Sequence, residues 1–350
     1  MIEYSVGILG EFRIEVKDSN GNITKQTDWQ KNLITDKGLD GIALSSFCAK
    51  CGVGSGNNAP DNSQTALQIP VAVSATTHTG IGGWGFTSSR VIIDELNKQM
   101  RRFFEFTYHF PKGSIPNKNI SELGLCSNHW DYAANTHSPN LTYNTRALIK
   151  DSHGNPTTIS IRADEELFVY YRLWAIYSLE KKEFILECPT MSGSTELSKK
   201  SYKLVVQVER SQDNPHAPFA PPKHDDHYRG NMYIGEVHTV NGLGSWVLDP
   251  AKPAGTPALY IGAGLKDYIN GSCYVELEGT VPANQFHRNK DPAEIKALVF
   301  FCNQGAFLAD IYDTEDESKG IPKTNQYEFT FAFRIKWKRY DGDLSIIKEN

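Results

Sequence analysis

The sequence predicts an all-β protein, built as a β-sandwich or jelly roll with long loops and one or two short helices. Many short segments alternate apolar and polar residues with a period of two, which is typical of half-buried strands. Clusters of Gly, Pro, Asn and Asp separate these segments and predict turns between them. Helical patterns are few, and the best candidates are residues 90–101 and 292–297.

The composition is that of a globular chain of 350 residues, with 39% apolar, 11% aromatic and 22% charged residues. This length is sufficient for one large β domain or two smaller ones. With a formal net charge of −5, the chain is not expected to bind nucleic acid. No segment approaches the roughly 18 consecutive apolar residues of a transmembrane helix, so membrane insertion is not expected. The amino terminus lacks the pattern of a signal peptide, which predicts synthesis in the cytosol and reduced cysteines.

Strand signals begin at the amino terminus. Residues 3–16 alternate and are rich in Tyr, Val, Ile and Phe, and a return strand is expected after the turn at residues 18–21. The segment KDSNGN at residues 17–22 has a near copy, KDSHGN, at residues 150–155, which predicts the same turn chemistry in both places. Residues 100–110 predict a strand with one aromatic face, formed by Phe104, Phe106, Tyr108 and Phe110.

The second half of the chain changes in character. Residues 167–176 form a nearly continuous apolar run, which predicts a strand that is covered on both faces. Between residues 181 and 289 the loops become long and polar, whereas residues 327–337 again predict a strong strand with one aromatic face. We therefore predict a main β-sandwich of residues 1–180 plus 290–345, and an inserted or elaborated loop-rich β region of residues 181–289.

The stretch of residues 29–67 organises the rest of the sequence. It contains NLITDKGL at residues 32–39, VGSG at residues 53–56 and QTAL at residues 64–67. The pattern predicts a short helix or turn, then a strand, then a long exposed loop. The glycines of this stretch allow the backbone to bend where a Cβ atom would clash.

This combination resembles the amino-terminal region of structural proteins of tailed-bacteriophage virions, in the tail, baseplate or tail-fibre group. The resemblance is weakest across residues 181–290, but it reaches both ends of the chain. Its further motifs are ISELGL at 120–125, TRALI at 145–149, the turn at 151–156, LFVYY at 167–171 and the closing KWKRY at 336–340.

The resemblance implies a viral structural protein that is made in the bacterial host cytoplasm and is incorporated into the virion. It implies a homo-oligomer whose partners are copies of itself and other tail or baseplate proteins. None of the motif residues forms a nucleophile, a base or a set of metal ligands. A non-enzymatic protein is therefore expected, with no catalytic residue, no cofactor-binding residue and no cofactor.

Several polar clusters were weighed as metal sites. Cys48 and Cys51 have CxxC spacing and could bind zinc together with Cys126 and His129, although no zinc-ribbon turn surrounds either pair. Divalent cations could also bind two other loops, for which a solvated surface is the favoured interpretation. These loops contain His216 with residues 224–227, and the acidic residues 313–317.

Two alternative functions involve host-surface glycans. A receptor-binding protein would use an aromatic platform, and a glycan-degrading enzyme would use two carboxylates such as Asp164 and Glu166. We favour the assembly function because aromatic residues at alternating strand positions are more often core residues. Trp130 and Trp246, in polar loops, are better candidates for exposed contacts. The platform would come from Trp84, Trp130, Trp174, Trp246 and Tyr228.

Overall fold

The structure of the chain is a computed structural model that describes most of the sequence. The described residues are 1–42, 47, 50–74, 86–115, 117–127, 130–131, 136–137, 141–192, 196–208, 230–235, 259–266, 268–281, 293–295, 297–302, 305–323 and 328–342.

The predicted all-β fold is confirmed, because strands dominate the described chain and its one helix is the short α1 (Asp36–Gly41). The two other helix predictions are wrong. Residues 90–101 belong to the hairpin of β6 (Phe86–Asp94) and β7 (Gln99–Phe110), and the described part of residues 292–297 is extended. At the hairpin, the Asp94 carboxylate accepts the N–H of Asn97 at 2.9 Å, so a turn forms where a helix would have to continue.

A central antiparallel sheet has the order β6–β7–β15–β1, where β15 is Glu166–Ser178 and β1 is Ile2–Lys17. β2 (Ile23–Gln26) and β3 (Gln30–Ile34) attach to the later part of β1. One face of this sheet is core, and the predicted aromatic face of β7 is buried there, which confirms that part of the prediction.

The prediction that both faces of β15 are covered holds only for the second half of the strand. Residues 173–177 are all buried. In the first half, Phe168, Tyr170 and Arg172 lie half-buried on the outer face of the sheet. A small second apolar cluster on that face explains the difference, since it covers only one end of β15; its buried members are Leu9, Phe103, Trp174 and Ile176.

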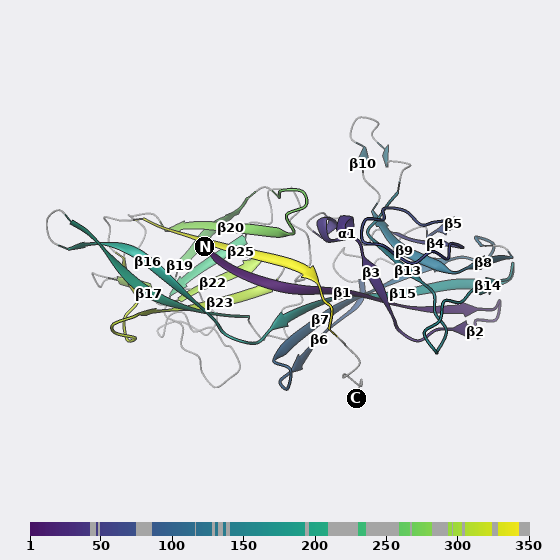
Figure 1. Cartoon of the computed structure of the whole chain (residues 1–350), viewed down its shortest axis with the longest axis horizontal. Coiled ribbons are helices and arrows are strands. Elements are labelled where there is room, and N and C mark those ends of the chain that lie inside the picture. The colour runs from purple at the N-terminus through teal and green to yellow at the C-terminus, as the bar shows by residue number, and fades with distance from the viewer. Residues whose placement is uncertain are drawn as a thin grey trace.

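The amino-terminal half of β1 leaves this sheet and pairs in parallel with β25 (Phe329–Arg339). Figure 1 shows β1 running along the middle of an elongated molecule and joining its two ends. β25 lies between β1 and β20, so hydrogen bonds connect residues 1–180 to strands of residues 181–289. From β25 the order continues antiparallel through β20 (Tyr274–Val281), β19 (Leu259–Leu265), β18 (Gly230–Gly235), β22 (Ala297–Cys302), β23 (Gly305–Asp313), β17 (Glu196–Val208) and β16 (Lys182–Ser192).

A smaller antiparallel group carries most of the sequence motifs. It begins at β3 and continues through β13 (Thr145–Leu148), β9 (Glu122–Ser127), β4 (Lys50–Gly54) and β5 (Pro70–Val73), with β12 (Thr142–Tyr143) beside β9. Loop 55–69, between β4 and β5, is largely exposed, as predicted. Three short pairs complete the described strands: β8 (Lys118–Ile120) with β14 (Ile159–Ile161), β10 (Trp130–Asp131) with β11 (Thr136–His137), and β21 (Ala293–Ile295) with β24 (Ile321–Lys323).

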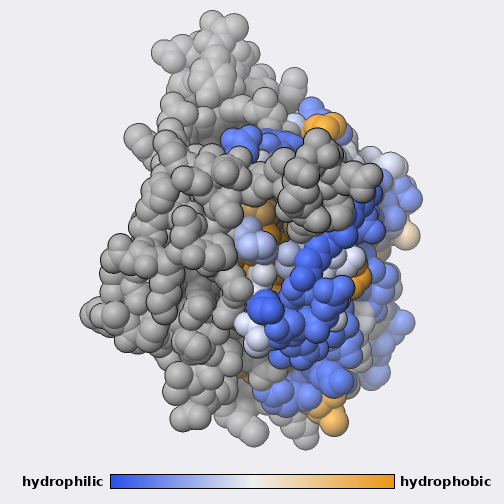
Figure 2. Space-filling model, turned by 90° about the vertical axis from the view of Figure 1, so that its left-hand side faces the viewer, coloured by the Kyte–Doolittle hydropathy of each residue, from blue (hydrophilic) through white to orange (hydrophobic). Residues whose placement is uncertain are grey.

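The end of the molecule that carries β16 and β17 presents a largely hydrophilic surface over its described residues (Figure 2). Hydrophobic side chains are scattered there, such as Ile185 on β16, which is 66% exposed. Single exposed apolar residues are normal on a protein surface and do not mark an interface. Polar features and grooves in other parts of the molecule are therefore the better candidates for contact sites.

Candidate functional site

Two of the four residues in the zinc prediction are described, and the sheet places them on opposite faces. Cys51 on β4 lies opposite Leu125 on β9, so its side chain shares the face of Leu125 in the main core. Cys126 follows Leu125 directly and therefore points to the other face, where it belongs to a separate cluster. The two sulfurs thus do not form half of one tetrahedral site, and Cys48 and His129 lie outside the described residues.

The acidic residues 313–317 are described, and lysines compensate their charge. Lys200 Nζ lies 2.5 Å from Asp313 Oδ2, and Lys319 Nζ lies 3.0 Å from Asp316 Oδ2. Hydrogen bonding to a serine and to Lys319 lowers the pKa of Asp316 to about 2. Across the described residues, no group of three or more His, Cys, Asp or Glu side chains is arranged to hold a metal ion.

The carboxylates proposed for glycan cleavage each have a basic side chain as a neighbour. Asp164 Oδ1 lies 3.6 Å from Arg162 Nε, and Glu166 Oε2 lies 3.1 Å from His109 Nε2. Asp164 is exposed in a turn, and Glu166 begins β15. Asp164 therefore forms an ion pair with Arg162 at the surface, and Glu166 forms a hydrogen bond with the His109 ring. The His-rich segment 215–229 lies outside the described residues.

One side chain of the predicted aromatic platform is described, and it is buried. Trp174 is 6% exposed, and its Nε1 donates to Glu11 Oε2 at 2.8 Å. Trp174 is therefore a core residue, so the prediction that it contributes to an exposed platform is wrong. Only the backbone of Trp130 is described. The three other residues of the predicted platform, Trp84, Trp246 and Tyr228, lie outside the described residues.

Other aromatic side chains do lie on the outer face of the central sheet, but cations cover their rings. Arg172 Cζ lies 4.0 Å from the ring centroid of Trp29 and 4.5 Å from that of Phe103. Arg13 Cζ lies 4.6 Å from the ring centroid of Tyr170. Guanidinium groups stack favourably on aromatic rings. A sugar would have to displace these cations before it could stack on the same ring faces.

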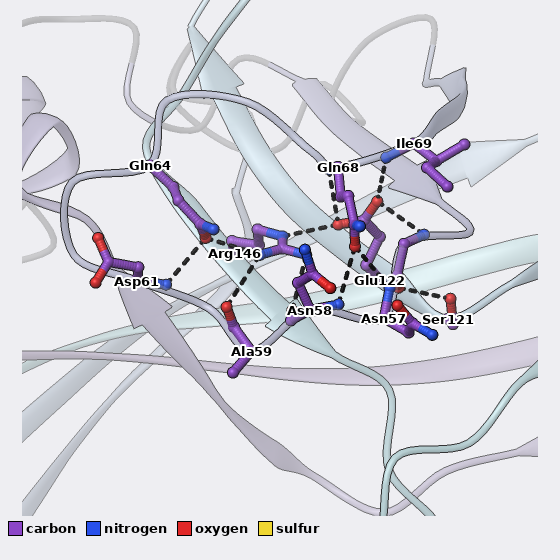
Figure 3. A network of polar contacts seen from close by, with 11 residues as sticks. Asn57, Asn58, Ala59, Asp61, Gln64, Gln68, Ile69, Ser121, Glu122 and Arg146 are labelled. Carbon is purple, nitrogen blue, oxygen red and sulfur yellow. Dashed lines mark hydrogen bonds and ion pairs between the residues drawn. The ribbon is translucent and has the colours of Figure 1, made fainter.

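Four motifs of the sequence meet in a buried polar network, to which QTAL contributes Gln64 (Figure 3). Glu122 comes from ISELGL on β9 and is 0% exposed, and Arg146 comes from TRALI on β13 and is 1% exposed. Arg146 Nε donates to Glu122 Oε2 at 2.7 Å. The side chains meet because β9 and β13 are hydrogen-bonded neighbours. The third motif, VGSG, leads into the loop that this pair holds.

The Glu122 carboxylate fastens both ends of loop 55–69. Its Oε1 accepts the N–H of Gly56 at 3.0 Å and the N–H of Ile69 at 2.8 Å. Its Oε2 accepts the N–H of Gln68 at 3.1 Å. A single buried carboxylate therefore joins the two ends of a loop that contains no strand or helix.

Arg146 holds the middle of the same loop. Its Nη1 donates to Gln64 Oε1 at 2.7 Å and to Ala59 O at 3.4 Å, and its Nη2 donates to Asn58 O at 3.0 Å. The planar guanidinium presents its donors in fixed directions, which makes it suited to several acceptors at once. We call the Glu122–Arg146 pair and its loop contacts the loop clamp.

Gly56 is required by the loop clamp because the chain passes very close to the carboxylate. A Cβ atom at this position would lie 2.5 Å from Glu122 Oε1 and would collide with the Cβ of Gln68. The φ angle of Gly56 is not in the left-handed region. Close approach, rather than the bending expected from the sequence, is therefore the reason for glycine here.

The electrostatics keep the loop clamp ionised. Burial by itself raises the pKa of Glu122, but the N–H of Ile69, the Arg146 guanidinium and the N–H of Gln68 outweigh burial and lower it. A general base or nucleophile needs a lone pair that is free to reach the substrate. The carboxylate oxygens already accept from the N–H groups of Gly56, Gln68 and Ile69 and from Arg146, so their lone pairs are engaged in holding the loop in place.

The NLITDKGL motif forms a second junction, where α1 meets the last strand. Trp337 Nε1 on β25 donates to Leu39 O at 2.7 Å. Arg339 Nη2 on the same strand donates to Asp36 Oδ1 at 2.5 Å. The first and last motifs of the resemblance are therefore in direct contact, although they are about as far apart in the chain as two motifs can be.

The sequence patterns alone assign no role to Glu122 or Arg146. A signal was present, since each is a charged residue inside a short apolar strand. A charge that enters a core is paired and hydrogen-bonded, because an isolated buried charge is strongly unfavourable. Pairing the charges of residues 120–125 and 145–149 would have found the loop clamp.

Comparison with known proteins yields no relative, since no protein-family model, curated protein or solved structure matches the chain. Among the described residues, no helix combines the length and apolar character needed to cross a membrane.

Proposed function

We propose that this chain is a non-enzymatic structural protein of a tailed-bacteriophage virion, located in the tail, baseplate or tail-fibre attachment region. It is made in the host cytoplasm and acts by binding copies of itself and neighbouring virion proteins. The β scaffold holds its connecting loops in fixed positions, and these loops provide contacts in the assembled particle.

One observation carries the proposal: the motifs that resemble virion proteins converge on the loop clamp and on the junction of α1 with β25. The motif residues therefore serve to order an exposed loop and to join distant strands. A loop that is ordered before binding loses less conformational entropy when it meets a partner. Loops on a rigid scaffold commonly carry the binding function of a protein, which suits an assembly role.

Purified particles test the proposal directly. Mass spectrometry is expected to find the chain in tailed particles, and cryo-electron microscopy is expected to place several copies around the tail axis. Loss of the gene is expected to yield particles without complete tails, and supplying the wild-type chain is expected to restore them. Absence of the chain from purified particles would contradict the proposal.

The isolated chain separates the two glycan alternatives. Binding on an array of host-surface glycans would support a receptor-binding tail protein. Release of new reducing ends from those glycans would support a tail enzyme. Either activity, in a chain that tail assembly does not require, would replace the assembly proposal.

A further inference from the structure

A groove of about 670 Å³ lies beside the loop clamp. Its walls come from β1, β3, residues 59–60 of the clamped loop, β13 with the turn at residues 150–156, and the chain that follows β25. Grooves of about 300–1,000 Å³ are the size that holds a small ligand or a short chain segment. Because Arg146 donates to Ala59 O, the loop wall of this groove is held in position.

The floor of the groove is partly apolar. Leu9 and Leu148 line it and are almost completely buried, while Leu33, Pro60 and Tyr340 line it with half-buried side chains. Side chains of this kind provide contact area for apolar groups without a large exposed patch. The groove is thus chemically different from the hydrophilic end of the molecule seen in Figure 2.

The rim of the groove carries positive charge that the described residues do not compensate. Lys31 and Lys150 are exposed, line the groove and form no ion pair with a described residue. Among the described residues, Lys31 Nζ donates to a backbone oxygen, Gly342 O, at 3.2 Å. Asp341 is the one acidic residue in the described lining. Two lysines against one aspartate leave an excess of positive charge, in a chain whose formal net charge is −5.

The two other cations of the lining are already neutralised. Arg146 is paired with Glu122 in the loop clamp, and Arg339 is paired with Asp36 at the junction with α1. Their side chains shape the groove, but their charges are compensated within the chain. The lysines at the rim are therefore the groups that distinguish between charged partners.

We infer that this groove binds an extended segment of a partner protein that carries both acidic and apolar side chains. The inference rests on the proposed assembly function, for which it names a contact site. Apolar side chains of the segment lie on the floor of the groove, and its carboxylates meet Lys31 and Lys150 at the rim. Since the loop wall is already ordered, binding does not require it to fold.

Fluorescence anisotropy with labelled peptides tests the inference on the full chain. The acidic probe is the hexapeptide Leu-Asp-Ile-Asp-Leu-Asp, and the matched probe is Leu-Lys-Ile-Lys-Leu-Lys. The acidic peptide is expected to bind and the lysine peptide is not, and added salt is expected to weaken binding because the charges at the rim are exposed. Equal binding of the two peptides, or no binding of the acidic one, would overturn the inference.

A pair of charge-reversal variants locates the site. Lys31→Glu with Lys150→Glu is expected to weaken binding of the acidic peptide roughly tenfold, since two favourable charge contacts are lost and the new charges repel. The control is Lys112→Glu with Lys118→Glu, which changes two exposed lysines outside the groove and alters the net charge equally. The control is expected to bind like the wild type. Equal loss in both variants would overturn the inference, and thermal unfolding checks that both remain folded.

The groove inference and the assembly proposal fail in different experiments. If the chain is found in tailed particles but the groove variants bind the acidic peptide like the wild type, the groove inference alone is overturned. If purified particles lack the chain, the assembly proposal is overturned whatever the peptides do.

Discussion

Loop 55–69 and the turns at residues 18–22 and 151–155 all connect strands, but different parts of the chain hold them. Each turn is held by the carboxylate of its own first residue, Asp18 or Asp151. Asp18 Oδ1 accepts the N–H groups of the residues two and four positions later, each at 2.9 Å. Asp151 makes the same two hydrogen bonds at the same distance. The repeated turn predicted from the sequence is confirmed.

Loop 55–69 depends instead on side chains from distant strands. Glu122 lies 66 positions after Gly56, and Arg146 lies 88 positions after Asn58. The glycines differ in the same way: Gly154 has a left-handed φ of 84°, whereas Gly56 is small to make room for a carboxylate. Short connections are thus set by their own residues, and the long one is set by the strands beneath it.

The largest effect is expected from Glu122→Ala, which leaves Arg146 buried without its partner. Removing one member of a buried ion pair costs about 3–5 kcal/mol. Urea denaturation measures the loss of stability, and hydrogen exchange of the Gly56, Gln68 and Ile69 amides measures release of the loop. Unchanged protection of these amides in a folded variant would disprove the loop clamp.

A paired replacement is the control for this prediction. Glu122→Leu with Arg146→Met removes both charges, so it is expected to recover part of the stability lost in Glu122→Ala. The three loop amides still lack their acceptor and are expected to exchange fast. The control therefore separates the cost of a buried charge from the ordering of the loop.

Acid is expected to lower the stability of the fold by protonating carboxylates that are held by partners distant in the chain. Burial raises the pKa of Glu165, but hydrogen bonds from Lys25, the backbone of Arg162 and Thr24 outweigh burial and lower it to about 2, from 4.5. A lowered folded-state pKa contributes stability that is fully present above pH 4.5 and is lost as the pH falls towards about 2. Urea denaturation across this pH range is expected to show a falling free energy of unfolding. The fall with decreasing pH is expected to be less steep for Glu165→Gln. An equal slope in the variant would show that Glu165 does not contribute.

Gly56→Ala is expected to have an intermediate effect, about 1–3 kcal/mol, because the added methyl group overpacks a buried site. The nearest obstacle is the Cβ of Gln68. Adding Gln68→Gly removes that atom, so a double-mutant cycle is expected to show that the two changes are coupled. Additive effects in the cycle would mean that the Cβ of Gln68 is not what excludes a side chain at this position.

The smallest effect is expected in the turn. Gly154→Ala places a side chain at a left-handed φ, which costs about 1–2 kcal/mol, and Gly154→Asn is expected to cost less because Asn tolerates this conformation. At Gly56 the order reverses, since Asn is larger than Ala. Thermal unfolding of the four variants checks this. If Ala and Asn rank in the same order of stability loss at both positions, the two glycines are not required for different reasons.

Much of the fold could be predicted from local pattern. The alternation in residues 3–16 and 327–337 predicts β1 and β25, and the apolar run at residues 167–176 predicts β15. The prediction for residues 90–101 failed because Asp94 and the residues after it form a turn, which outweighs a helical spacing of apolar residues. The prediction that Trp174 belongs to an exposed aromatic platform was wrong because the sequence does not show which face of a strand is covered.

The sequence by itself determined the strands, the repeated turn and the short helix, because their causes act over a few residues: side-chain alternation, Asx hydrogen bonds and glycine at left-handed φ. Only the tertiary structure decided that Glu122 and Arg146 form a clamp and that Cys51 and Cys126 face apart. Pairing of strands brings Glu122 and Arg146 together across 24 positions and brings them to the loop backbone across 53 to 88 positions, and no local pattern specifies which groups will meet.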